Sequence, residues 1–199
     1  MNERPIIIID GLNLFMRHYA AHPAMSQNGE QVGGIVGFIN GISFLSQKIG
    51  PSEIYVVWEG QGSFKKRHIY KDYVEGVEAD DAIGYMCKYK FKDKRKVVIS
   101  SDHDYYQLLD KTTLIYSPTL KGFVNKNTVA EKYKVSAENF CLAKSVAGDS
   151  SDNIPGVKGI SYKTFAKLLP ESTSSQEITL DELFKKVQEL YSEKQSLLE

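Results

Sequence analysis

The sequence predicts an α/β fold with a central, mainly parallel sheet flanked by helices. Three short runs, residues 5–9, 53–58 and 96–100, are rich in β-branched or aromatic side chains. They show no polar alternation, as expected for strands covered on both faces. Each run leads into an acidic residue at its carboxyl end, where ligands bind in open α/β sheets. These distant segments should therefore converge on one crevice.

The elements of this region follow in order. The first strand leads into Asp10, the second into Glu59 and the third into Asp102. Between the first two strands, apolar residues at three-and-four spacing predict an amphipathic helix with glycines on its close-packed side. A second helix is expected over residues 80–91, with acids in its first turn, where they suit the helix dipole. The apolar positions of the first helix are Ile35, Phe38, Ile39, Ile42, Leu45 and Ile49.

From about Thr128 the pattern changes to helices and turns, so an α/β core over residues 1–130 and a helical region over 131–199 are predicted. Ser136 is expected to cap a helix that ends near Ala147, and Ser161 to open a helix that Pro170 stops. Residues 171–177 are predicted to form a polar linker. A terminal amphipathic helix is indicated by Leu180, Leu183, Phe184, Val187, Leu190, Tyr191 and Leu198.

Composition sets limits on function. The chain has 199 residues, 42% of them apolar, and a formal net charge of zero, so any nucleic-acid affinity must come from local basic patches or bound metal. Cys87 and Cys141 lack metal or disulfide spacing and are predicted to be thiols in a reducing compartment. No signal peptide and no apolar run of membrane-spanning length is recognised, so we expect a cytoplasmic protein without a membrane partner.

The carboxylates are the most informative feature of the chain. Singly, each has an ordinary structural explanation as a turn, a helix cap or an Asx-turn. Together they supply the oxygen ligands that Mg²⁺ or Mn²⁺ prefers, and two such ions can drive in-line attack on a phosphodiester. We therefore predict a metal-dependent nuclease. The predicted ligands are Asp10, then Glu78, Asp80 and Asp81 in VEADD, Asp102 and Asp104 in SSDHD, and Asp149 and Asp152 in GDSSDN.

Other motifs suggest contacts with phosphates. In GVKGI, Gly156 and Gly159 let the backbone approach a ligand closely, and Lys158 and Lys163 add positive charge. Gln107 is expected to orient one of the acids or a bound water. Two readings stay open for Lys65, Lys66 and Arg67: a solvated charged face, or catalytic groups that hold the scissile phosphate. No catalytic role is assigned to the four histidines.

The motifs IIIIDGLNLFMRHYAA, GVEADDAIG, SSDHDYYQLL and GDSSDNIPGVKGI resemble the 5′-nuclease family over roughly residues 4–169. That family includes flap endonucleases, bacteriophage 5′–3′ exonucleases and the nuclease domains of bacterial DNA polymerases. The resemblance implies a PIN-like core with two divalent ions and a helix–three-turn–helix region with its hairpin at 148–169, often holding K⁺. It implies that the eight acids act as metal ligands, directly or through water, and that Gly156, Val157, Gly159 and Ile160 form the duplex-gripping hairpin.

The chain departs from the family pattern twice. Glu59 stands where the family usually has aspartate; it is a ninth predicted ligand. Tyr73 is followed at once by Val74, where the family has a helical arch that threads the 5′ strand. Either the arch is deleted, or a segment belongs between these two residues. An intact mass above 22.4 kDa would support the second explanation.

The resemblance implies two-metal-ion hydrolysis that leaves a 5′ phosphate, on DNA with 5′ flaps, nicks or ends, or on RNA–DNA hybrids. Tyr73 is expected to stack near the strand's entrance. The protein is expected to be a monomer in a bacterial or phage-infected cell, with a polymerase or single-strand binding protein as partner. Two alternatives stay open: a catalytically impaired duplex-binding module without the arch, and a PIN-type ribonuclease.

Overall fold

The computed structural model describes residues 3–59, 78–150 and 153–196. Contacts within the chain divide the protein into two compact units, residues 1–125 and 126–199. Five residues with predicted roles, Lys65, Lys66, Arg67, Tyr73 and Asp152, lie outside the described residues. None of the described helices is long and apolar enough to cross a membrane.

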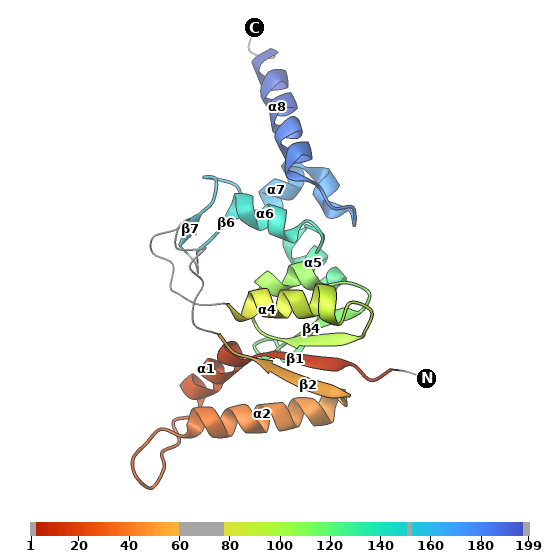
Figure 1. The fold of residues 1–199 in the computed structure, drawn as a ribbon. Coiled ribbons are helices and arrows are strands. Elements are labelled where there is room, and N and C mark those ends of the chain that lie inside the picture. Colours follow the sequence, from red (N-terminus) through yellow and green to blue (C-terminus); the bar gives the residue numbers. More distant parts are fainter. Residues whose placement is uncertain (1–2, 60–77, 151–152, 197–199) are drawn as a thin grey trace. The chain divides into compact units, whose positions relative to one another are not determined.

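The first unit is built on a five-stranded sheet (Figure 1). β1 pairs in parallel with β2 and β3, β3 pairs in parallel with β4, and only β5 runs antiparallel. The predicted mainly parallel sheet is confirmed, and each predicted strand is present within one residue at its ends. β4 and β5 were not predicted. In spatial order the strands are β2 (Glu53–Val57), β1 (Ile6–Asp10), β3 (Lys96–Ile99), β4 (Thr113–Ser117) and β5 (Gly122–Val124).

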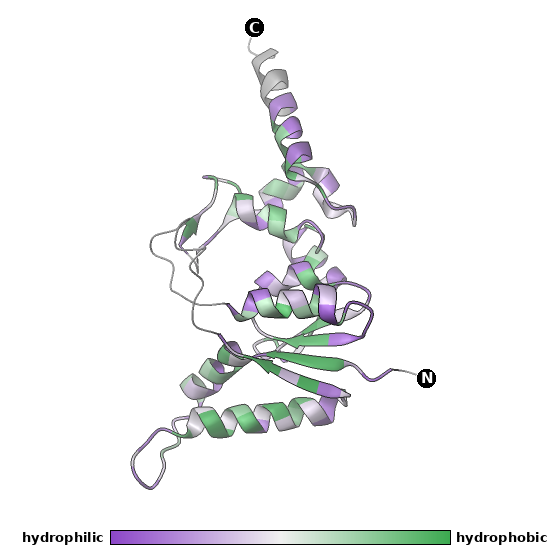
Figure 2. Cartoon of the chain, viewed as in Figure 1, coloured by the Kyte–Doolittle hydropathy of each residue, from purple (hydrophilic) through white to green (hydrophobic). Residues whose placement is uncertain are grey.

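Helices cover both faces of this sheet. α2 (Gly33–Ile49) and α4 (Ala79–Tyr85) lie on opposite sides of it (Figure 1). α4 continues as a π-helical turn, η1 (Met86–Lys90). α1 (Gly11–Ala21), which was not predicted, packs with α2 through a cluster around Leu14, Leu45 and the odd-numbered side chains of β1. β1, green in Figure 2, and β3 are buried along their whole length, as predicted for strands covered on both faces, whereas the edge strand β2 is largely exposed.

Glycines allow α1 and α2 to approach closely, as predicted for the α2 pattern. A Cβ added at Gly37 would lie 2.8 Å from the Cβ of His18, and one at Gly41 would lie 2.7 Å from its Nε2. Contacts this short do not occur in folded proteins, so Gly37 cannot gain a side chain without a shift of α1, and Gly41 could gain one only if the His18 ring moved.

The start of β3 is held by a buried cation. The Lys96 side chain is 1% exposed, and its Nζ donates to the carbonyl oxygens of Phe91 and Lys94 and to Thr112 Oγ1, each at 2.9 Å. These bonds compensate the cost of burying an ammonium group. The turn between η1 and β3 is thereby fixed.

The second unit is helical. Its core contains Val135, Ala143 and Phe165, and the Ser161 hydroxyl caps α7 by accepting a hydrogen bond from Thr164 N at 3.2 Å, as predicted. The elements are α5 (Lys126–Tyr133), α6 (Phe140–Ala147), β6 (Gly148–Asp149), β7 (Ile154–Pro155), α7 (Tyr162–Leu168), η3 (Pro170–Thr173) and α8 (Leu180–Ser196).

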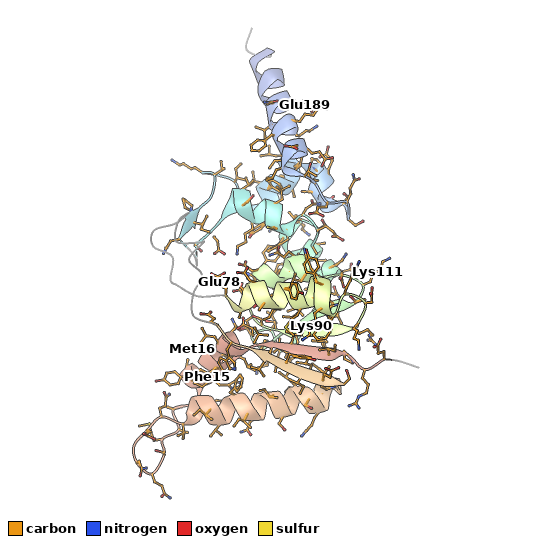
Figure 3. All side chains as sticks on the ribbon, viewed as in Figure 1. Phe15, Met16, Glu78, Lys90, Lys111 and Glu189 are labelled. Atoms are coloured by element: carbon orange, nitrogen blue, oxygen red, sulfur yellow. The ribbon has the colours of Figure 1, made fainter. Side chains whose placement is uncertain are left out.

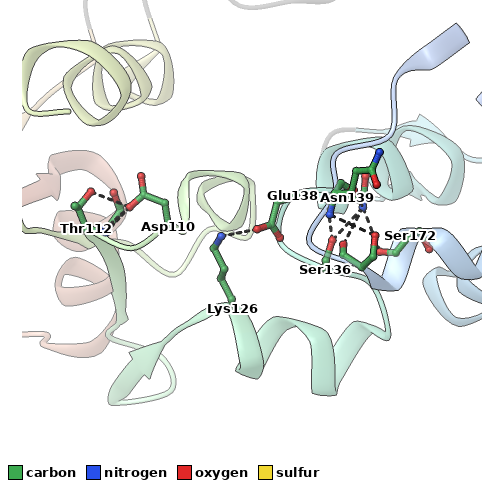
Figure 4. Close-up of polar contacts among 10 residues, drawn as sticks. Asp110, Thr112, Lys126, Ser136, Glu138, Asn139 and Ser172 are labelled. Atoms are coloured by element: carbon green, nitrogen blue, oxygen red, sulfur yellow. Dashed lines mark hydrogen bonds and ion pairs between the residues drawn. The ribbon is translucent and has the colours of Figure 1, made fainter. Parts of the chain in front are cut away.

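The predicted helix start at Ser136 is wrong. α6 begins at Phe140, because Ser136 Oγ accepts from Asn139 N at 3.3 Å and closes a separate turn. The Asn139 amide then donates to Gln176 O at 2.8 Å and accepts from Ile178 N at 2.8 Å (Figure 4). This fully buried asparagine also orders the predicted polar linker, whose first part is the 3-10 turn η3.

Candidate metal centre

Three elements bring predicted ligands to the carboxyl end of the sheet. Asp10 ends β1, Asp102 follows β3, and Asp80 lies in the first turn of α4. Asp10 is 6% exposed, and its Oδ1 accepts from Asn13 N at 3.0 Å, so it also caps α1. The predicted convergence of strand-end acids is therefore found for Asp10 and Asp102, which Asp80 of α4 joins; Glu59, the third strand-end acid, is exposed.

The Ser100 hydroxyl ties two of these acids together. It donates to Asp10 Oδ2 at 3.2 Å and accepts from Asp102 N at 3.1 Å. Asn13 adds a second link, because its Oδ1 accepts from Ser101 N at 3.1 Å. Neither Ser100 nor Asn13 was recognised in the sequence, where short polar residues beside acids carry no distinct signal.

Tyr105 joins the third acid to the first. It lies in η2 (Asp104–Leu108), is 2% exposed, and its hydroxyl contacts Asp10 Oδ2 at 3.2 Å and donates to Asp80 Oδ1 in a short hydrogen bond. Burial, followed by the negative charge of Asp10, raises the pKa of Tyr105 well above its usual range. The phenol is therefore a permanent hydrogen-bond donor at this site.

Asp80 responds most strongly to the crowding of negative charge. Its pKa is raised to about 6, chiefly by burial and also by the charges of Asp102, Asp10 and Asp104, while the hydrogen bond from Tyr105 lowers it. Four of the predicted ligands therefore lie close enough to influence one another electrostatically.

A cavity of about 360 Å³ opens beside this group. Glu78, Asp80, Asp81 and Asp104 all line it, so the VEADD acids meet the second acid of SSDHD. Glu78, at the start of α4, is labelled in Figure 3. Two aromatic residues that the sequence reasoning missed, Tyr85 and Tyr89, also line the cavity; they are 61% and 71% exposed, with ring centroids 5.4 Å apart.

The remaining predicted residues lie in other settings. Glu59 is exposed two residues after β2. Gln107 donates to the backbone oxygen of Asp104 at 2.9 Å rather than to a carboxylate. In the second unit, Asp149 forms an ion pair with Lys144 at 2.5 Å.

The acids meet some of the requirements of a divalent cation. In the described ranges, no three His, Cys, Asp or Glu side chains are close enough to hold one ion together. The chemistry of the group nevertheless fits Mg²⁺ or Mn²⁺, since all its ligands are hard carboxylate oxygens. A cation would also relieve the mutual repulsion that raises the pKa of Asp80. The acids therefore suit a metal in type and charge, although in this conformation they do not enclose one.

The glycine-rich hairpin of the second unit is tightly closed. A Cβ at Gly156 would lie 2.1 Å from Ala147 O, and Val157 N donates to Val146 O at 2.8 Å, so the loop lies directly on the end of α6. Residues 156–159, which include Lys158, are exposed, Ile160 is half-buried, and Gly159 has a φ of 86°. Lys163, in the first turn of α7, is also exposed.

Comparison with known proteins identifies relatives of this fold and site. Residues 73–134 match the family described as 5′-3′ exonuclease, N-terminal resolvase-like domain. DNA polymerase I of Caldicellulosiruptor bescii is 29% identical over 92% of this chain and 26% of its own length. The 5′-3′ exonuclease of Aquifex aeolicus is 26% identical over 88% of this chain and 72% of its own. The chain thus spans about a quarter of the polymerase it matches.

Solved structures show the same fold. A mutant of the T5 5′-exonuclease superposes with a TM-score of 0.70 at 22% identity, covering 86% of this chain and 74% of that one. The bacteriophage T5 D15 flap endonuclease, in a pseudo-enzyme-product complex with DNA and metal ions, gives 0.67 at 20% identity, covering 86% and 76%.

The fold is similar to those of the T5 5′-exonuclease and the T5 flap endonuclease. The resemblance predicted from the motifs is confirmed: the chain is similar to 5′-nucleases in its sequence motifs and in its fold. Its alignment with the Caldicellulosiruptor polymerase runs over 225 residues, more than the 199 of this chain, so the polymerase carries residues with no counterpart here.

Proposed function

We propose that this protein is a divalent-metal-dependent 5′-nuclease that hydrolyses phosphodiester bonds of DNA near 5′ ends, flaps or nicks. The observation that carries the proposal is the convergence of acids from β1, α4 and the segment after β3 at one end of the sheet. Acids from three separate elements, joined by Ser100 and Tyr105, concentrate negative charge at one place, which a cation would neutralise. RNA of RNA–DNA hybrids is a further proposed substrate.

The first unit would hold the metal ions, which we propose to be two Mg²⁺ or Mn²⁺. Bound there, such ions supply positive charge against the developing charge of the phosphate and lower the pKa of water. The described acids that would hold them are Asp10, Glu78, Asp80, Asp81, Asp102 and Asp104. Glu59, Asp149 and Asp152 are further proposed ligands. The bound-metal structure of the T5 flap endonuclease supports this assignment by analogy.

Other residues of the chain would bind the nucleic acid. We propose that Lys65, Lys66 or Arg67 steadies the scissile phosphate and that Tyr73 stacks near the entrance of the strand. The exposed hairpin from Gly156 to Ile160, with Lys158 and Lys163, would contact duplex phosphates as part of a helix–three-turn–helix motif, with K⁺ as a candidate ion. These contacts would not read sequence, because phosphates carry none. A polymerase acting on the same DNA is a plausible partner, since DNA polymerase I is among the relatives.

One observation favours a second candidate function. In the described part of the chain, no three acids already enclose an ion. A protein whose acids failed to close on metal would bind duplex DNA through the hairpin without cutting it. The second candidate is therefore a catalytically impaired, structure-specific DNA-binding module.

The test is cleavage of end-labelled 5′-flap and nicked duplexes with Mg²⁺, compared between wild type, Asp102→Asn and the exposed-acid control Asp93→Asn. We expect cutting near the junction that is lost without Mg²⁺, falls at least 100-fold in Asp102→Asn, and is unchanged in Asp93→Asn. Duplex binding without cutting by the wild type would instead establish the binding module. Cleavage of single-stranded RNA in preference to flaps would favour a ribonuclease.

A further inference from the structure

A second cavity lies at the opposite end of the first unit's sheet from the acids. It measures about 440 Å³, within the size range of small-ligand sites. The amino ends of β1, β3 and β4 form its rim, together with the carboxyl end of α2 and Phe123 of β5. Lys111 of this rim is labelled in Figure 3, at the other end of the unit from Glu78. Its charged lining residues are Glu3, Arg4, Lys48, Arg95, Lys96 and Lys111.

The charge of this cavity is strongly positive in a protein whose net charge is zero. Five of the six charged lining residues are basic, and among the residues that the structure describes none of the five forms an ion pair. Asp110 and Asp93 are near enough to act on the charge of Lys96. Asp110, however, accepts hydrogen bonds from Thr112 N at 2.7 Å and Thr113 N at 2.6 Å, so it is already engaged in its own turn (Figure 4).

Four of the five cations keep donors for a ligand. Lys96 is fully engaged with protein oxygens and contributes only its fixed charge. Arg4 uses one of its five N–H groups, on Gly50 O at 2.9 Å, and Arg95 uses one weakly, on Glu3 O at 3.5 Å. Lys111 has no hydrogen bond or ion pair to any described residue. Guanidinium and ammonium groups that keep such donors are well suited to bind a phosphate.

The apolar side chains that line the cavity indicate that its ligand has an apolar part as well as a negative charge. Phe123 is 46% exposed and Leu114 is 36% exposed, and both line it. The ring of Phe123 is supported edge-on by Tyr116, with centroids 5.3 Å apart. An inorganic anion would leave this aromatic surface in water, whereas a ligand that joins a phosphate to a flat apolar ring would cover it.

We propose that this cavity binds a free nucleotide, with its phosphate among Arg4, Arg95 and Lys111 and its base against Phe123. The site is separate from the acids at the other end of the sheet and does not depend on the proposed nuclease function. Because the attraction is partly electrostatic at an open cavity, binding should weaken as salt is added.

The experiment is isothermal titration calorimetry of the full chain with dAMP, in buffer containing EDTA so that no metal links the nucleotide to the acids. We expect saturable binding at one site. The double variant Arg95→Gln/Lys111→Gln should weaken it at least tenfold, since two charge-assisted contacts are lost. Lys167→Gln/Lys185→Gln, which removes the same charge from exposed positions of the second unit, should leave it unchanged.

A second arm tests the aromatic wall. Inorganic phosphate should bind more weakly than dAMP, and Phe123→Leu should reduce dAMP to about the affinity of phosphate, with unfolding curves confirming that each variant is folded. Absence of saturable binding, or equal weakening by both double variants, would overturn the proposal. The proposal would also be overturned if Arg95→Gln/Lys111→Gln lost duplex-DNA binding but kept dAMP binding, because the cavity would then be a contact for the DNA backbone.

Discussion

At the scale of single residues, the hydroxyl of Tyr105 has one proton to donate and lies beside two carboxylates that could accept it. It donates to Asp80 and lies 3.2 Å from Asp10, so the two acids are held at a fixed separation by a group that cannot satisfy both fully. A group that orients metal ligands without touching the metal typically contributes substantially to affinity. We therefore assign Tyr105 a positioning role in the metal centre.

Replacing Tyr105 by phenylalanine should weaken Mn²⁺ binding about tenfold or more. Loss of a residue that hydrogen-bonds to a metal ligand typically lowers metal affinity by this amount. The measurement is Mn²⁺ binding followed by electron paramagnetic resonance. Nuclease activity should fall at limiting metal and recover when the metal is in excess. Tyr116→Phe, which removes a buried hydroxyl elsewhere in the same sheet, is the control and should bind Mn²⁺ like wild type. Equal affinity in Tyr105→Phe would contradict the role.

A second prediction concerns Asp80 and pH. Its folded-state pKa of about 6 lies above the ordinary 3.8, so the folded protein holds this proton more tightly than the unfolded chain. The corresponding stability is fully present below about pH 4 and is lost as the pH rises through 6. In metal-free buffer at pH 7, Asp80→Asn should therefore be more stable than wild type by about 1 to 2 kcal/mol, allowing for solvent screening.

Urea unfolding from pH 4 to pH 8 would check this, with the gap between the two proteins closing toward pH 4. A pH-independent gap would show that the amide acts through packing rather than through removal of the charge. Mg²⁺ should stabilise wild type more than Asp80→Asn, because the variant lacks one carboxylate.

Sequence reasoning found the acids of this site but not the residues that join them. Asp10 and Asp102 were predictable because they follow apolar runs, and Asp80 because it lies in a dense acidic motif. Tyr105 and Ser100 were missed, since a tyrosine in an apolar turn resembles an ordinary core residue. Their role depends on which elements meet in space, and a local pattern does not contain that information.

At the scale of elements, the contact between α1 and α2 depends on small residues. The Cβ that Gly37→Ala would add lies 2.8 Å from His18 Cβ, an atom fixed to the α1 backbone. We expect a loss of about 1 to 3 kcal/mol, typical of overpacking. Gly84→Ala is the matched control, because its Cβ would meet nothing within 4 Å in another helix; it should be neutral or stabilise by up to about 1 kcal/mol.

Chemical denaturation of the two glycine variants compares them directly. If Gly37→Ala were as stable as wild type, the helices would have to separate at no cost, and the close contact would not be a determinant of stability.

Elements differ in how clearly the sequence predicts them. β1 was clear because four isoleucines in succession suit a strand buried on both faces. β4 was missed because its apolar run is only three residues long and is bounded by the polar residues Thr113 and Ser117, although both are buried. The start of α6 was misplaced because Ser136 has the chemistry of a helix cap but closes a turn that Asn139 anchors to residues distant in sequence. In these cases tertiary contacts override the local signal.

At the scale of the whole molecule, each unit has a hydrophobic cluster of its own among the described residues, around Leu14 and Leu45 in the first and around Ala143 and Phe165 in the second. Its single tryptophan, Trp58, packs on Phe38 in the first unit, with ring centroids 5.3 Å apart. Tryptophan fluorescence therefore reports on the first unit, whereas the helical circular dichroism signal reports on both units.

We expect the thermal unfolding curves from these two probes to differ, since independently cored units need not unfold together. Added Mg²⁺ should move the fluorescence transition to a higher temperature, because most of the proposed ligands lie in the first unit. Coincident curves under all conditions would show one cooperative unit instead.

The buried ammonium group of Lys96 also affects how the results of a mutational screen of this protein should be interpreted. Loss of its side chain removes the ammonium donor from Lys94 O and one of the two donors to Phe91 O, which keeps Lys94 N, just before β3 begins. β3 is four residues long, roughly 13 Å at the usual rise per residue, and its far end leads to Asp102. A mutational survey that measured only loss of cleavage would therefore group Lys96 with the acidic site residues. Its role is instead to fix the start of β3, the strand that leads to Asp102.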